Sequence, residues 1–231
     1  MKRTGATLGL IAASAASSLA TIVIDDFATG AYFRSISSGS AVESQAGGML
    51  GGQRDTLLRI QTPGANPLLT LEMLIGGGIQ FSSSAATVDG MCGLQWDGNG
   101  GAAEEVGVVP GFADFNDIAG LGMSFLGEDR FRVQFLYADQ TMAIQMVVRS
   151  GGIDYVANHL YTYSVVNDHD DFLFSEFAGA NMGAVQSVTV RFDPPTSGDF
   201  ALLGVAAVPE PGSLAALALG ALVLARKRRS R

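Results

Sequence analysis

The chain has 231 residues, 48% of them hydrophobic, and it carries 22 acidic against 14 basic side chains. Cys92 is the only cysteine, which excludes an internal disulfide, so any folded domain has to rest on its hydrophobic core. Residues 21–207 hold seven arginines, no lysine and 21 acidic residues, and this net charge of −14 argues against nucleic acid as a partner.

The first 20 residues have the pattern of a secretory signal peptide. Lys2 and Arg3 form a charged start, residues 8–16 form a short apolar core, and Ser-Leu-Ala at 18–20 resembles an A-x-A cleavage site. The sequence therefore predicts export by the general secretory machinery and cleavage by signal peptidase between Ala20 and Thr21. A cut after Ala16 and an uncleaved anchor are the alternatives.

Residues 21–207 suit a single domain in size, and their regular segments read as strands. Residues 130–137 alternate apolar and mostly polar side chains, residues 142–148 do the same, and the short segment 138–140 between them predicts a β-hairpin. No stretch keeps a helical period for three turns. The sequence thus predicts an all-β body, an antiparallel β-sandwich that resembles a jelly roll. The other candidate strands, between clusters of glycine, are 21–27, 56–61, 68–75, 79–83, 93–96, 153–166, 171–177, 185–192 and 200–205.

Residues that could carry catalysis are few and do not form a known pattern. His159 and His169 lack the spacing of a zinc protease, Ser124 lacks the second glycine of a nucleophile elbow, and Cys92 lies in an apolar strand. Carboxylate pairs at 104–105, 114 with 117, and 128–129 are expected by chance among so many acids. We therefore predict that the protein is not an enzyme.

Calcium is the one metal for which the sequence offers ligands. Asp168, Asp170 and Asp171 follow Asn167 within five residues, and residues 97–99 with 104–105 form a second oxygen-rich stretch. Calcium takes six to eight oxygen ligands, but neither stretch has EF-hand spacing. A solvated acidic loop is the favoured interpretation, and no other cofactor is predicted.

The last 24 residues have three parts in a fixed order. The first part, Val208-Pro209-Glu210-Pro211, is stiff and non-helical because of its prolines. The second part, residues 212–225, is uncharged and predicts one apolar helix. The third part is the basic end, with Arg226, Lys227, Arg228, Arg229 and Arg231. A full membrane span needs about 20 apolar residues, whereas this uncharged run is 14 residues long, so it predicts a minimal or thinned transmembrane span. The basic end favours a cytoplasmic C-terminus. A buried C-terminal helix is the alternative.

This tail resembles the PEP-CTERM sorting signal of Gram-negative bacteria, through the motif Pro209, Glu210 and Pro211, the apolar run and the terminal arginines. The resemblance implies recognition by exosortase, a membrane-embedded cysteine protease or transpeptidase. It also implies removal of the tail near the motif, transfer to the cell surface, and a link to exopolysaccharide and biofilm. The expected organisation is a signal peptide at 1–20, a β-sandwich body at 21–207 and a sorting signal at 208–231.

Three short elements of the body carry a second resemblance. They are Asp-Asp-Phe at 25–27, Gly-Gly-Gln-Arg-Asp at 51–55 and Trp-Asp-Gly at 96–98, and their order is similar to that in a group of exported PEP-CTERM proteins with no assigned activity. The glycines permit a turn with positive φ, and Arg54 beside Asp55 predicts a bidentate pair that locks neighbouring strands. We expect a structural role for these elements.

These observations favour a surface or matrix protein that passes through the inner membrane transiently and ends at the cell surface or outside the cell. The alternative is a secreted carbohydrate-binding module that contacts extracellular polysaccharide. A glycoside hydrolase is the third hypothesis. Aromatic side chains available in principle for stacking on sugars are Trp96, Tyr137, Tyr155, Tyr161 and Tyr163.

Overall fold

The computed structural model describes residues 21–29, 32–83, 88–98, 105–109, 112–115, 120–162 and 167–210. This part of the chain is built from antiparallel strands, with two short 3-10 turns, η2 (Leu50–Gly52) and η3 (Phe174–Glu176). The strands are β1 (Ile22–Asp25), β2 (Phe33–Ile36), β3 (Ser40–Ala46), β4 (Gln53–Thr62), β5 (Leu69–Met73), β6 (Ile79–Ser83), β7 (Asp89–Trp96), β8 (Glu105–Val109), β9 (Phe112–Phe115), β10 (Arg130–Ala138), β11 (Met142–Ser150), β12 (Ile153–Tyr161), β13 (Asp168–Leu173), β14 (Val185–Asp193) and β15 (Phe200–Val208).

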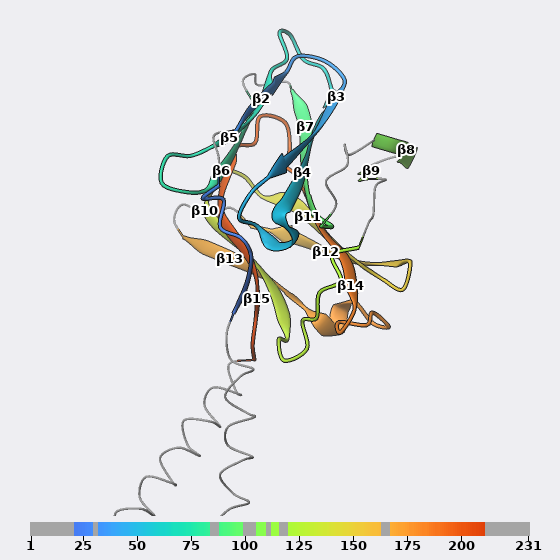
Figure 1. Ribbon diagram of the computed structural model, residues 1–231. Helices are drawn as coiled ribbons and strands as arrows, with labels where there is room; N and C mark the ends of the chain where they lie inside the picture. Colours follow the sequence, from blue (N-terminus) through green and yellow to red (C-terminus); the bar gives the residue numbers. More distant parts are fainter. Residues whose placement is uncertain are drawn as a thin grey trace, which may run out of the picture.

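Two large sheets make up the body (Figure 1). Sheet A has the strand order β13-β10-β15-β6-β5-β2, and β1 also pairs with β15. Sheet B has the order β12-β11-β14-β7-β4-β3, while β8 and β9 form a separate two-stranded sheet. The predicted all-β antiparallel sandwich is therefore confirmed.

The core lies between the two sheets. In β10, Phe131, Val133 and Phe135 are fully buried, as the alternating pattern predicted. The ring of Phe135 meets Phe192 of β14 edge to face at 6.1 Å, and since β10 belongs to sheet A and β14 to sheet B, this contact spans the sandwich. Burial of such large side chains is the main driving force that holds the two sheets together.

The predicted hairpin between β10 and β11 is wrong. Both segments are strands, but β10 pairs with β13 and β15 in sheet A, whereas β11 pairs with β12 and β14 in sheet B. The short connection 139–141 therefore crosses from one sheet to the other. An alternation of apolar and polar residues shows that a strand has one buried face, but it does not show which strand is its partner. Two strands that cover the same core from opposite sheets therefore have the same pattern as the two strands of a hairpin.

Strand β15 organises the end of the sandwich at which the described chain starts and stops (Figure 1). Along one side β15 pairs with β10 over its whole length, from Phe200 to Val208. Along the other side Phe200–Leu202 pair with β6, and the second half pairs with β1. The predicted signal peptide at 1–20 and the predicted tail helix at 212–225 lie outside the described residues, and the described part of the chain holds no helix with the length and hydrophobicity of a membrane span.

Candidate functional site

The junction between the folded body and the predicted sorting signal lies at the last residue of β15. Val208 is opposite Arg130 in the strand pairing, and its carbonyl accepts a hydrogen bond of 3.0 Å from the Asp129 amide. The next residue, Pro209, is buried, and Glu210 is exposed. Strand β15 thus runs to Val208 and leaves no spacer before the Pro-Glu-Pro motif, of which Pro211 lies outside the described residues.

The start of the body lies beside this junction. In the pairing of β1 with β15, Ile22 is opposite Ala207 and Val23 is opposite Ala206. Facing Cα atoms of antiparallel strands are about 5 Å apart. Thr21, the predicted first residue after signal cleavage, therefore lies next to the end of β15, while Ala20 lies outside the described residues. A surface pocket of about 340 Å³ lies at this junction, and its lining includes Thr21, Val208 and Arg132.

A buried ion pair anchors β1 to the rest of the body. The Asp25 carboxylate accepts hydrogen bonds from the Arg54 guanidinium at 2.6 Å, from the Trp96 indole at 2.9 Å and from the Phe27 amide at 2.8 Å. Arg54 also donates to Gln45 and lies 5.1 Å from the centre of the Phe27 ring. Since Asp25, Arg54 and Trp96 are each at most 2% exposed, ligands have no access to this cluster.

This cluster unites the three elements singled out in the sequence. Asp25 and Phe27 come from the first, Arg54 from the second and Trp96 from the third. A Cβ on Gly51, whose φ is 77°, would lie 2.8 Å from the Cα of Gly98, so the second and third elements also touch through their glycines. The expected structural role is supported by this geometry.

The predicted pair between Arg54 and Asp55 is not formed. Neighbouring residues of a strand point to opposite faces, so Arg54 enters the core and reaches Asp25, while Asp55 accepts a hydrogen bond from Ser44 on the other face of sheet B. Arg54 does join strands, but it joins β4 of sheet B to β1 of sheet A. The signal that sequence reasoning missed was Asp25 itself, which lies 29 residues earlier.

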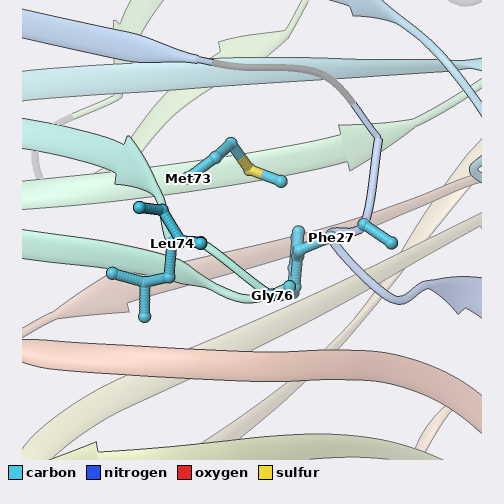
Figure 2. Close-up of a pocket in the computed structure, with 7 residues that line it drawn as sticks. Phe27, Met73, Leu74 and Gly76 are labelled. Carbon is cyan, nitrogen blue, oxygen red and sulfur yellow. The ribbon is translucent and has the colours of Figure 1, made fainter.

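An apolar pocket of about 450 Å³ lies next to this cluster. Its lining includes Phe27 and Met73, two residues that also contact Arg54, together with the turn from Leu74 to Gly77. Figure 2 shows Phe27 and Gly76 at one side of the pocket and Met73 and Leu74 at the other. Ile75, at the tip of the turn, is fully exposed.

The three predicted calcium ligands lie in strand β13 and not in a loop. Asp168 accepts a hydrogen bond from Tyr161 at 3.2 Å, and Asp170 lies 2.9 Å from His159. Asp171 points to the opposite face of the strand. The structure therefore does not gather the three carboxylates around one point, and the described residues contain no cluster of three or more His, Cys, Asp or Glu side chains suited to a metal ion.

Asp171 is held by two arginines of β10. Arg132 donates to its carboxylate at 2.7 and 2.8 Å, and Arg130 donates at 3.2 Å. Burial alone raises the pKa of Asp171, but the hydrogen bonds from Arg132 and Arg130 outweigh it and hold that pKa below its usual value. This carboxylate is engaged in pairing β13 with β10.

His159 joins the outer edges of the two sheets. From β12 its Nδ1 lies 2.9 Å from Asp170 in β13, its Nε2 lies 2.7 Å from Glu176, and its ring stacks on Phe172 with centroids 4.0 Å apart. Burial lowers the pKa of His159, but the two carboxylates more than compensate and the net pKa is raised. Both ring nitrogens of His159 thus have a carboxylate as hydrogen-bond partner.

Several other candidate residues lie in the core. Cys92 is 1% exposed, and burial raises the pKa of its thiol, which leaves little of the reactive thiolate. Trp96 is fully buried and Tyr161 is 6% exposed, so neither presents a ring face to a sugar. Tyr163 lies outside the described residues.

Residues 207–229 match the family model of the PEP-CTERM protein-sorting motif. The chain therefore ends in a PEP-CTERM sorting motif. The match begins at Ala207, so this PEP-CTERM motif overlaps the last two residues of β15. A PEP-CTERM motif marks a protein for export and for exosortase, as the resemblance of the tail predicted. No curated protein matches the chain.

Solved structures show remote similarity. A family 11 carbohydrate-binding module of the Clostridium thermocellum cellulase Lic26A-Cel5E is 13% identical, with a TM-score of 0.40 over 83% of this chain and 96% of that one. The module TmCBM61, solved with β-1,4-galactotriose, is 9% identical, with a TM-score of 0.35 over 80% and 91%. The family 11 xylanase of Neocallimastix patriciarum is 9% identical, with a TM-score of 0.33 over 75% and 96%. These likenesses are too remote to assign a ligand or an activity.

Proposed function

We propose that this chain is a non-enzymatic surface or matrix protein that exosortase releases from a transient anchor in the inner membrane. The PEP-CTERM match at 207–229 carries the proposal. In this account the general secretory machinery exports the chain, signal peptidase removes the first 20 residues, and the apolar run holds the folded body at the outer side of the membrane. Exosortase then removes the tail, and the body joins the extracellular polymer layer that accompanies biofilm.

The structure supports this order of events because the two ends of the body lie side by side. The partners Ile22 and Ala207 place the start and the end of the body at one pole, so a chain held at both ends by one membrane can form both sheets completely. The net charge of −14 in residues 21–207 keeps the released body soluble and repels other polyanions.

The test compares native cells with cells that lack exosortase. We expect the mature body outside the native cells and full-length chain, with its arginine-rich end, in the membrane fraction of the mutant cells. An unchanged distribution and an unchanged mass in the two strains would contradict the proposal.

A carbohydrate-binding module is the second candidate, and one feature of sheet B favours it. On the face that points away from the core, Arg191 donates to Gln145 at 2.7 Å and Gln145 donates to Asn158 at 2.9 Å. Amide groups such as those of Gln145 and Asn158 are suited to sugar hydroxyls, whereas Arg191 is only 9% exposed and orients Gln145. Asn158 is exposed, so loss of glycan-array binding on Asn158→Ala, with unchanged stability, would favour this function; Trp96→Ala is unsuitable because Trp96 belongs to the core.

A further inference from the structure

The folded body restricts where a protease can cut the sorting signal. Strand β15 is paired on both sides almost to its end, with Phe131 opposite Ala207 on one side and Ile22 opposite the same residue on the other. Ala207 is fully buried. A protease needs several residues of free, extended backbone, so cleavage within this stretch first requires local unfolding of sheet A.

The first residues after the strand differ from each other in exposure. Val208 is still held by the hydrogen bond that its carbonyl accepts from the Asp129 amide at 3.0 Å. Pro209 is buried, whereas Glu210 is exposed. The transition from protected to accessible backbone therefore falls between Pro209 and Glu210, inside the Pro-Glu-Pro motif.

We propose that the folded body protects the backbone through Pro209, so that exosortase cuts the tail after Glu210 or after a later residue. The proposal rests on the proposed function. Hydrolysis of such a bond consumes one water, leaves a carboxylate on the new last residue of the body and releases the tail with a free amine at its new start. Transfer to an amine acceptor in place of water leaves an amide on that last residue, and the mass of the product distinguishes the two reactions.

The first measurement is the C-terminal residue of the processed protein from native cells, read by mass spectrometry. The expected C-terminus is Glu210 or a later residue. A product that ends at Pro209 or earlier overturns the proposal. If only full-length chain is found, both in native cells and in cells that lack exosortase, the proposed function has failed. The second measurement then tests the protection of the backbone without exosortase.

The second measurement treats the purified full chain in detergent with proteinase K. We expect the body fragment to end at Glu210 or later, since the protection comes from the fold.

The matched variants are Asp129→Pro, which removes the amide that donates to Val208, and Asp129→Ala, which keeps this amide and removes only the carboxylate. The proline variant should increase fragments that end before Glu210 about fivefold, as loss of one hydrogen bond predicts, and the alanine variant should behave like the parent. Trimming of the parent into β15, or equal behaviour of the two variants, overturns the proposal.

Discussion

Asp25 and Arg54 form an ion pair that is almost fully enclosed, with 2.6 Å between Oδ2 and Nη1 and side chains that are 1% and 0% exposed. The pair joins β1 of sheet A to β4 of sheet B. Because β1 in turn pairs with the end of β15, this contact connects the centre of the sandwich to the point where the sorting motif begins.

Asp25→Asn should destabilise the body strongly. The substitution leaves the Arg54 charge buried without its counter-ion, and removing one partner of a buried pair costs about 3–5 kcal/mol. Urea unfolding of residues 21–210 measures the change in the free energy of unfolding. The matched control is Asp26→Asn, because Asp26 is exposed and only accepts a local hydrogen bond from the Ala28 amide; its effect should stay within about 0.5 kcal/mol. Equal effects of the two substitutions would show that the ion pair is unimportant.

Val133→Asp should prevent folding. Val133 is fully buried in β10, in the core between the sheets, and an unpaired charge there costs several kcal/mol, a large part of the stability of a single domain. Circular dichroism should show loss of the β spectrum. Gln134→Asp, one position along on the exposed face of the same strand, is the control and should retain the spectrum.

The sequence predicted the strands of the body better than their partners. In β10, the alternation from Phe131 to Phe135 identified a strand and its buried face correctly, but the choice of sheet depends on contacts far along the chain that a local pattern does not encode. The start of strand β13 was interpreted as an acidic loop, and a strand was predicted only from residue 171, because Asp168, Asp170 and Asp171 hide the alternation. In the fold their carboxylates bind partners on β10 and β12.

For the candidate site, prediction succeeded where the signal is local. The PEP-CTERM motif is a short continuous pattern and was found directly. The Asp25 cluster was not found, although its three segments were singled out, because Asp25 and Arg54 are 29 residues apart and only the fold brings them together.

The stability of the body should depend on His159 as the pH rises. The pKa of His159 is raised in the fold above its unfolded value of about 6.5, so its stabilising contribution is fully present below that value and is lost as the pH rises through the folded pKa. We expect the difference in melting temperature between the parent and His159→Gln to be largest near pH 5.5 and to shrink towards pH 9. A difference that grows with pH would contradict the proposed pairing of His159 with Asp170 and Glu176.

Pro209→Ala combined with Pro211→Ala should block processing. Without the prolines, the backbone around Glu210 loses its bias towards extended geometry, and the predicted tail helix can extend backwards. Full-length chain should then accumulate in the inner membrane fraction, detected by immunoblotting. Glu210→Gln keeps the prolines and removes only the charge, so it tests separately whether the enzyme recognises the carboxylate. Normal release of the double proline variant would refute this role of the motif.

Replacing Arg226, Lys227, Arg228, Arg229 and Arg231 with serine should have a different effect. An uncharged run of 14 residues anchors weakly without its basic end, so we expect uncut chain to slip through the membrane and appear outside the cell. Cell fractionation together with the mass of the chain distinguishes this outcome from membrane retention.

The central claim is that the chain is exported, held briefly by its tail and released by cleavage at the PEP-CTERM motif. Mass spectrometry of the native protein from the extracellular fraction tests it most directly, since it reads both ends at once. The account predicts a mature chain that begins near Thr21, ends near Glu210 and contains no residue of the basic end. Recovery of intact peptides covering residues 226–231 from the extracellular fraction would contradict it.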